Sequence, residues 1–320
     1  MIFLFRKRAT RQVRKVLDEG IRLLLFVISC LLIGCSDDKI ENVEEEEFNE
    51  IKVMTFNVLY STSNEATLQA LLEADADIIG LQEISTSRLM ELAQQLRYHF
   101  HSFSKSDGNL NDQDTGILSR FPFTRYSENG VVVRVNSGLD VGIFTVHLAP
   151  YPYQPYDFRD GVITTAEQAI QAATQTRIPS ITSVLEEVDE LKAVGIPVFF
   201  TGDFNEPSHL DWTTETASSN LHFGKVVAWP VSKSITQAGL IDTYRLKFPK
   251  SADFPGITWT TIESENEVYD RIDMVYHTTS DAYEVKDVRL IGGPDDNAGI
   301  KVQDYESDHY AVVATYKLLN

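Results

Sequence analysis

The sequence of 320 residues has few cysteines, few basic residues and no apolar run of membrane-spanning length. Two cysteines, Cys30 and Cys35, exclude a small scaffold held by several disulfides. Lys and Arg number 28 against 47 Asp and Glu, so a chain of net charge −19 is disfavoured as a non-specific binder of nucleic acid. No solenoid, collagen or coiled-coil period is present. Because 43% of the residues are apolar, we expect a globular protein whose function must be read from local motifs.

The N-terminal segment has the pattern of a lipoprotein signal peptide. Residues 1–34 hold seven basic and two acidic residues and end in an apolar run over residues 23–34. A spanning helix needs about 20 apolar residues, so this shorter run is typical of a secretory signal. Leu32-Ile33-Gly34-Cys35 resembles the bacterial lipobox, which predicts lipidation of Cys35. The alternative is a plain apolar segment that happens to end in a cysteine.

An acidic tether is expected between the lipid anchor and the folded domain. Residues 36–50 hold eight acids and one base, a composition that cannot bury enough apolar surface to fold. We therefore predict an extended tether over residues 35–50 that contacts the membrane through the lipid on Cys35. The predicted location is the outer membrane of a bacterium, facing the periplasm or the cell surface.

From residue 51 to residue 320 the pattern predicts one α/β domain with helices covering layered sheets. A helix is expected from near Pro179, because apolar residues recur at helical spacing from Ile181 to Val194 and Gly195 follows. Strands are expected at residues 52–58, 77–81, 116–118, 131–135, 141–147, 197–200, 271–276 and 310–316.

Side chains that can bind a metal or move a proton stand where the expected strands end. Such positions meet at one rim of a sheet, so we expect these side chains to converge. Carboxylate and amide oxygens suit Mg²⁺, and the lack of a His-x-x-x-His pair speaks against zinc. Each residue alone could instead cap a turn or a helix. The residues are Asn57, Glu83, His147, Asp203, Asn205, Asp270, Asp273, Asp308 and His309.

In this order, the motifs resemble those of the endonuclease/exonuclease/phosphatase superfamily over residues 51–318. Gly202-Asp203-Phe204-Asn205 and Ser307-Asp308-His309 are the most specific matches, and residues 115–122 resemble the family's internal strand and turn. The resemblance implies a four-layer α/β/β/α sandwich with two packed, mostly antiparallel sheets. It also implies a Mg²⁺-dependent hydrolase of phosphate esters with one or two ions, Mn²⁺ being the alternative ion.

The resemblance also implies roles for the residues at the metal and the attacking water. Glu83 would bind the ion directly, with Asn57 and Asp308 close by. Asp203 would orient or deprotonate the attacking water, while Asn205 would donate a hydrogen bond to a phosphate oxygen.

Two histidines complete the catalytic set that the resemblance implies. His309 would stabilise the developing charge or act as a base, held in its tautomer by Asp273, with Asp270 as the alternative orienting group. His147 would lie across the phosphate as a second donor or a general acid.

The substrate is the part of the function that the sequence specifies least. Residues 148–161 contain three tyrosines, three prolines and Arg159, and we expect Tyr151, Arg159 and, farther on, Trp212 to bind substrate. A packed loop is the alternative. No stripe of basic and aromatic residues indicates a nucleic-acid groove. We expect a phosphodiesterase or phosphatase acting on a small or lipid-linked ester. The alternatives are a surface nuclease for DNA or RNA and a non-catalytic glycan- or lipid-binding lipoprotein, and no oligomeric state is predicted.

Overall fold

The computed structural model describes residues 49–103 and 114–319. The expected signal peptide, Cys35 and nearly all of the expected tether lie outside the described residues and stay predictions. The described residues belong to one compact unit. Within the described ranges, no helix has both the length and the apolar character that crossing a membrane requires.

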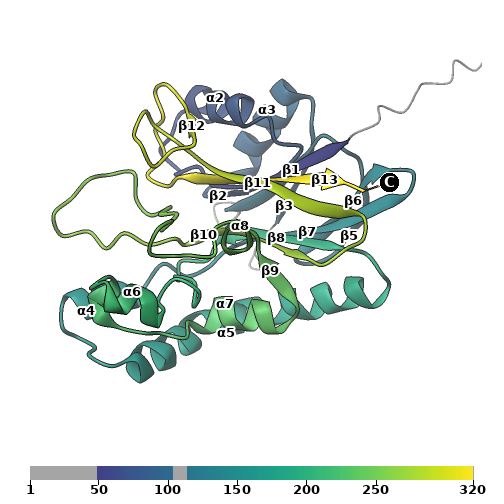
Figure 1. The fold of residues 1–320 in the computed structure, drawn as a ribbon. Coiled ribbons are helices and arrows are strands. Elements are labelled where there is room, and N and C mark those ends of the chain that lie inside the picture. The colour runs from purple at the N-terminus through teal and green to yellow at the C-terminus, as the bar shows by residue number, and fades with distance from the viewer. Residues whose placement is uncertain (1–48, 104–113, 320) are drawn as a thin grey trace, which may run out of the picture. The chain divides into compact units, whose positions relative to one another are not determined.

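Two stacked β-sheets form the centre of this unit (Figure 1). One consists of β1 (Glu50–Asn57), β2 (Ile78–Gln82), β3 (His99–Phe103), β4 (Thr115–Ser119), β11 (Tyr283–Gly292), β12 (Ile300–Lys301) and β13 (Ala311–Leu318), in the order β12-β11-β13-β1-β2-β4-β3. The other consists of β5 (Phe123–Tyr126), β6 (Gly130–Asn136), β7 (Leu139–His147), β8 (Val198–Asp203), β9 (Leu240–Asp242) and β10 (Asp273–Thr278), in the order β5-β6-β7-β8-β10-β9. Among the described strands, β1 with β2, β7 with β8 and β11 with β12 are parallel, and the remaining pairs are antiparallel.

Helices cover the outer faces of both sheets (Figure 1). The seven-stranded sheet is covered by α2 (Asn64–Ala74) and α3 (Thr86–Leu96), and the six-stranded sheet by α5 (Ala166–Ala193) and α7 (Pro230–Gln237). This arrangement is the α/β/β/α sandwich predicted from the sequence. The short elements are α4 (Gln154–Arg159), α6 (Thr214–Ser218), the 3-10 helix η1 (His222–Gly224) and α8 (Thr243–Lys247).

The expected strands are all present close to their predicted bounds, whereas β3, β5, β9, β11 and β12 were not expected. β3, β5, β9 and β12 are edge strands, and β3 and β5 expose much of their length, so they lack a clear apolar pattern. β11 is long, but an irregularity between Val285 and Asp287 shifts its alternation of buried and exposed residues.

The predicted start of the helix near Pro179 was wrong. α5 begins at Ala166, where Thr165 and Gln168 form a capping box, and Pro179 lies inside the helix. Proline lacks an N–H and usually ends a helix, but Pro179 and Gln175, whose carbonyl loses its partner, are both exposed, so water can satisfy that carbonyl.

The two sheets meet closely near the strand ends. A Cβ at Gly80 would lie only 2.1 Å from Thr201 Oγ1 of the opposite sheet, so only glycine permits this approach. Beside it, Gln82 Nε2 donates to Thr145 Oγ1 across the interface at 2.9 Å, and Thr55 Oγ1 donates to Gln82 Oε1 at 3.3 Å. Farther along, aromatic and aliphatic side chains fill the space, with the rings of Phe199 and Tyr316 4.7 Å apart between centroids.

Candidate active site

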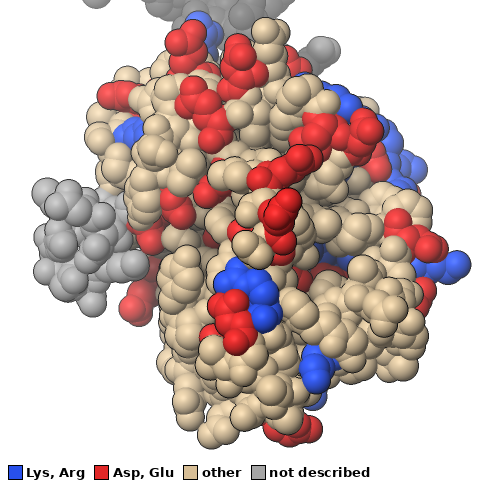
Figure 2. Space-filling model, turned by 90° about the vertical axis from the view of Figure 1, so that its left-hand side faces the viewer, with Lys and Arg blue, Asp and Glu red and all other residues tan. Residues whose placement is uncertain are grey.

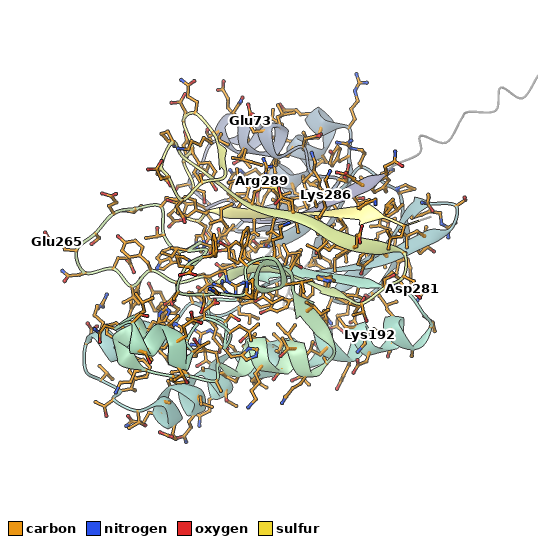
Figure 3. The ribbon with its side chains drawn as sticks, in the orientation of Figure 1. Glu73, Lys192, Glu265, Asp281, Lys286 and Arg289 are labelled. Atoms are coloured by element: carbon orange, nitrogen blue, oxygen red, sulfur yellow. The ribbon has the colours of Figure 1, made fainter. Side chains whose placement is uncertain are left out.

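The strand ends that carry the predicted residues meet at the left of Figure 1, where residues 248–272 project as a loop with Glu265 at its outer end (Figure 3). Strand register explains part of this convergence. Asp203, the last residue of β8, lies opposite Asp273 of β10 and beside His147 of β7. A cavity of about 220 Å³ opens there, lined by Glu83, His147, Pro150, Tyr151, Tyr153, Tyr156, Asp203, Asn205, Trp259, Ile272, Asp308 and His309.

Asn57 joins the two sheets at the base of the site. Its amide Nδ2, at the end of β1, donates to Glu83 Oε1 at 3.1 Å and to Asp203 Oδ2 at 3.0 Å. The backbone N–H of Leu59 donates to Asn57 Oδ1 at 3.1 Å, which fixes which way the amide faces. Nε2 of His309 lies 3.5 Å from the same Nδ2 atom. Asn57 therefore holds carboxylates of both sheets next to one imidazole.

His309 and Asp273 form a buried pair. Nδ1 of His309 lies 2.9 Å from Asp273 Oδ2, and its Nε2 lies 3.8 Å from Asp203 Oδ2. Burial lowers the pKa of His309, but the charges of Asp273 and Asp203 outweigh it and raise that pKa to about 10. The imidazole is therefore positively charged near neutral pH, with Nε2 directed toward Asp203.

Asp270, the alternative orienting group, lies in a different network. Its Oδ2 accepts a hydrogen bond from the Tyr153 hydroxyl at 3.0 Å, and its Oδ1 accepts one from Trp212 Nε1 at 2.8 Å. Burial raises the pKa of Asp270 to about 7. The geometry thus places Asp273, three residues later, against His309.

His147 lies on the opposite side of Asp203 from that pair. Its Nε2 is 3.7 Å from Asp203 Oδ2 and 3.9 Å from Glu83 Oε1, while its Nδ1 is 3.1 Å from Asp114 Oδ2. Burial lowers the pKa of His147, but the bond to Asp114 and the charge of Asp203 raise it above its ordinary value overall. Asp114 was not among the predicted residues, because it lies just before the 115–122 motif and outside it.

Glu83 and Asn205 have unusual backbone conformations. Their φ angles are 56° and 48°, in the left-handed region that side chains other than glycine and asparagine rarely adopt. Both follow a strand, and the turn directs each side chain into the cavity wall. Asn205 Nδ2 donates to Leu148 O at 3.0 Å and to Asp203 Oδ2 at 3.3 Å, so its two amide hydrogens both have protein acceptors.

The donor set of the cavity fits a divalent cation. Among its lining residues, Glu83, Asp203 and Asp308 are acids, and none is Lys or Arg. Burial raises the pKa of Asp308, and the charges of Glu83 and Asp203 add to this effect while His309 opposes it. A cation would offset this crowding of negative charge, and oxygen ligands suit Mg²⁺.

A second group of possible ligands adjoins these acids, in which the carboxylates can bind a cation and the protonated imidazole of His309 cannot. In the described part of the chain, Asp203, Asp273 and His309 form a group whose ligand atoms all lie within 4.8 Å of one another. Asp273 Oδ1 is buried without a hydrogen-bond partner among the described residues. Asp203 connects this group to the predicted ligand Glu83, since both carboxylates accept from Asn57.

The predicted substrate-binding residues are only partly brought together. Tyr151 lines the cavity, as does Asn205. Trp212 does not, because its indole is fully buried and packs against Trp229 with ring centroids 5.1 Å apart. Arg159 does not either, because its guanidinium binds Asp160 and donates to the carbonyl of residue 266 at 2.7 Å. Proximity in sequence to His147 or Asn205 therefore did not determine whether a side chain points into the cavity.

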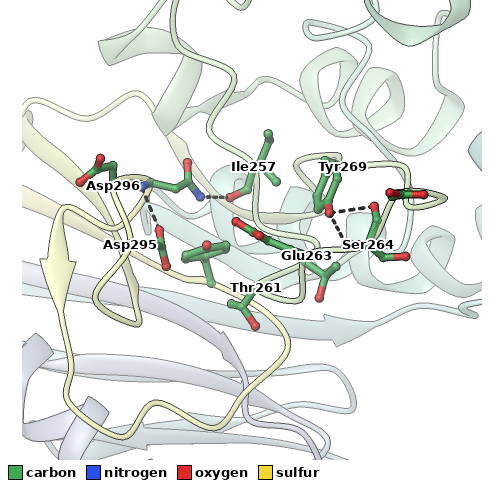
Figure 4. Close-up of a pocket in the computed structure, with 11 residues that line it drawn as sticks. Ile257, Thr261, Glu263, Ser264, Tyr269, Asp295 and Asp296 are labelled. Atoms are coloured by element: carbon green, nitrogen blue, oxygen red, sulfur yellow. Dashed lines mark hydrogen bonds between the residues drawn. The ribbon is translucent and has the colours of Figure 1, made fainter.

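A wider hollow of about 750 Å³ is lined by residues of the 257–270 segment and of the turn at residues 295–297 (Figure 4). Thr260 Oγ1 and the Thr261 N–H both donate to the carbonyl of Asp308, which fixes that segment beside the site. Four acids line this hollow, and no Lys or Arg is among its described lining residues: the acids are Glu263, Glu265, Asp295 and Asp296.

The sequence profile of the Endonuclease/Exonuclease/phosphatase family matches residues 54–309. The chain belongs to this family. The matched range contains every residue of the site described above. An uncharacterized protein of Caenorhabditis elegans is 28% identical in an alignment of 328 positions that covers 93% of this chain and 99% of that protein.

Solved structures share the sandwich of the endonuclease/exonuclease/phosphatase family. D. rerio TDP2 complexed with single strand DNA product is 18% identical with a TM-score of 0.54, covering 84% of this chain and 100% of that one. The human Nocturnin catalytic domain with bound sulfate anion is 17% identical with a TM-score of 0.54, covering 85% and 95%. A family protein from Bacteroides thetaiotaomicron is 16% identical with a TM-score of 0.51, covering 83% and 97%. At these identities the likeness concerns the fold.

Proposed function

We propose that this protein is a divalent-metal-dependent phosphoesterase that hydrolyses a small or lipid-linked phosphate ester by attack of water at phosphorus. The observation that carries the proposal is the grouping of His309, Asp203, Asn57, Glu83 and His147 around one cavity in a member of the endonuclease/exonuclease/phosphatase family. A purely binding protein gains nothing from burying an imidazole and several carboxylates together, because their burial costs free energy.

Glu83 and Asp308 would hold the cation, with Asp203 at its edge. Asn57 could join them only after its amide turns, because its Nδ2 faces the carboxylates and its Oδ1 accepts from the Leu59 N–H. The bound ion, Mg²⁺ or Mn²⁺, supplies positive charge that offsets the charge of the phosphate oxygens. Asp203 accepts hydrogen bonds from Asn57 and Asn205, so its carboxylate is fixed in place to orient a water molecule or to take its proton. Donation from Asn205 to a phosphate oxygen requires Nδ2 to leave one of its two protein acceptors.

The two histidines would act as donors to the phosphate. His309 is kept protonated by Asp273, which favours stabilisation of developing negative charge over a role as base. His147 is also favoured in its charged form, and its Nε2 lies within 4 Å of Asp203 and Glu83 on the cavity side. The imidazole of His309 therefore supplies local positive charge in a protein whose net charge is strongly negative.

The charge around the site favours a compact ester over a nucleic-acid strand. Acidic side chains gather across the middle and upper part of the face toward which the site opens (Figure 2). The acidic hollow beside the site would repel a polyphosphate chain laid along it. Because D. rerio TDP2 is complexed with a single strand DNA product, a DNA strand is the competing substrate.

A panel of phosphate esters tests the proposal. Bis-p-nitrophenyl phosphate, p-nitrophenyl phosphate, a phospholipid and plasmid DNA would each be incubated with the protein and Mg²⁺ or Mn²⁺. We expect hydrolysis of at least one non-nucleic-acid ester, loss of activity with EDTA, and a loss of several orders of magnitude in His309→Ala. The matched control is His209→Ala, a histidine outside the cavity lining. Cleavage of DNA alone would favour a nuclease, and full activity of His309→Ala would refute the site.

We also propose that the protein is exported and anchored by lipid on Cys35. The support is the lipobox-like sequence and the acidic segment that follows it. Mass spectrometry of the mature N-terminus, with Cys35→Ser as the control, tests this. A mature chain that still carries residues 1–34 would contradict it.

A further inference from the structure

Aromatic residues from two separate segments form one side of the active-site cavity. Tyr151, Tyr153 and Tyr156 come from the stretch that includes α4, and Trp259 comes from the loop before β10. We name these four residues the aromatic wall. The rings of Tyr153 and Tyr156 meet edge to face, with centroids 4.9 Å apart, and Trp259 lies 4.8 Å from the imidazole of His309. The wall therefore begins directly beside the catalytic group.

The polar atoms of three of these residues are occupied by carboxylates outside the cavity lining. The Tyr153 hydroxyl donates to Asp270, and the Tyr156 hydroxyl donates to Glu267 Oε1 at 2.6 Å. Trp259 Nε1 donates to the Tyr156 hydroxyl at 3.0 Å and lies 3.2 Å from Glu267 Oε1. These donors are already paired, so what the three residues offer to a ligand is mainly the apolar surface of their rings.

Two arginines fix the segment that carries the tyrosines. Arg177, fully buried in α5, donates to the carbonyls of Ala149 and Pro152 at 3.0 Å each and to Gln154 Oε1 at 2.8 Å. On the outside, the guanidinium of Arg159 lies 4.4 Å from the ring centroid of Tyr156. The wall is thus held in place before any ligand arrives, which lowers the entropy cost of binding.

We propose that the aromatic wall is the subsite for the organic group of the substrate ester, and that this group is a planar ring on a substrate with a single phosphate. The inference rests on the proposed phosphoesterase function. Rings stack on aromatic side chains, and each such contact raises affinity by about 2- to 12-fold beyond simple burial.

Size and charge narrow the substrate further. A cavity of about 220 Å³ is smaller than the roughly 300 to 1,000 Å³ of sites for drug-sized ligands, so it suits one phosphate and a compact ring. Because its described lining includes neither Lys nor Arg, no basic side chain is available there for a second phosphate.

Phosphonates test this subsite without any leaving-group chemistry. Calorimetric titration of the full chain with Mg²⁺ would compare phenylphosphonate with methylphosphonate, which share one anionic head. We expect phenylphosphonate to bind at least about tenfold more tightly. In Trp259→Leu and Tyr156→Leu the ratio of the two affinities should fall toward one, while methylphosphonate still binds. Tyr156→Phe keeps the ring and should retain most of the preference for phenylphosphonate.

Tyr126→Leu, which removes an exposed tyrosine outside the cavity lining, is the control and should behave as wild type. Equal affinities of the wild-type protein for the two phosphonates would overturn the ring subsite. The proposed phosphoesterase function would still stand if an ester of the panel is hydrolysed. Tighter binding of octylphosphonate than of phenylphosphonate would replace the ring by an alkyl chain and overturn it too. Failure of every phosphonate to bind, with no ester hydrolysed, would overturn both proposals. The wild-type comparison decides even where a wall variant does not fold.

Discussion

Replacing Asp273 by asparagine is expected to lower kcat for the best ester of the panel by about 10²- to 10⁴-fold. At an N–O distance of 2.9 Å, the attraction between Asp273 and the imidazolium of His309 is about 6 kcal/mol at an effective dielectric constant of 20. The rise in the pKa of His309 from 6.5 to about 10 corresponds to about 5 kcal/mol of stabilisation of the charged imidazole, to which Asp203 and Asp308 contribute together with Asp273. The expected drop in kcat corresponds to a rise of about 3 to 5 kcal/mol in the activation barrier, which is no larger than the interaction energy between Asp273 and His309.

The pH profile separates loss of charge from loss of structure. With Asp273 present, His309 keeps its proton until the pH approaches about 10, whereas in Asp273→Asn it should lose it at lower pH. The alkaline limb of kcat should therefore move to lower pH. The matched control is Asp270→Asn, a buried aspartate three residues away that contacts Tyr153 and Trp212 instead. If Asp273→Asn kept wild-type kcat and Asp270→Asn lost it, the assignment of the orienting carboxylate would be reversed.

Three further predictions concern stability. Mg²⁺ added to EDTA-treated protein should raise Tm, by an amount equivalent to about 2.7 kcal/mol at 100 times Kd, and a full shift in Glu83→Gln would exclude Glu83 as a ligand. Burial raises the pKa of Glu206 to about 8 from 4.5, so between these pH values the folded chain binds a proton that the unfolded chain does not. The free energy of unfolding should therefore fall by up to about 5 kcal/mol as the pH rises from 4.5 to 8. In Glu206→Gln this fall should be absent, as measured by denaturation at several pH values. Arg177→Met should lower the free energy of unfolding by at least about 3 kcal/mol in the same denaturation assay, because several buried acceptors lose their donor. An unchanged denaturation midpoint would show that these acceptors find other partners.

The sequence predicted the convergence of the site because strand ends are visible in the apolar pattern. Asp203 ends one buried run and Asp273 begins another, and pairing of the two strands brings them opposite each other. His147 joins them for the same reason. A residue at the end of a strand lies at the edge of the sheet, so its place in the site followed from the strand pattern alone.

Residues in loops and short helices could not be placed in this way. Trp212 and Arg159 stand close in sequence to Asn205 and His147, yet the first is buried and the second faces outward. Trp259 was not predicted at all, because its contact with Tyr156 joins segments 103 residues apart. Nothing in the local pattern of either segment indicates the other. The edge strands β3 and β5 were missed for a related reason, since their exposed side chains leave no periodic signal.

The hydrogen bonds that cross between the sheets give the fold a mechanical role. Apolar side chains alone would let two stacked sheets slide, because dispersion contacts have little directional preference. Hydrogen bonds are directional, and Gln82 links Thr55 of one sheet to Thr145 of the other. The residues of the candidate site, which come from both sheets, are thereby aligned to within the tolerance of a hydrogen bond. Activity should consequently report lateral slippage between the layers well before the chain unfolds.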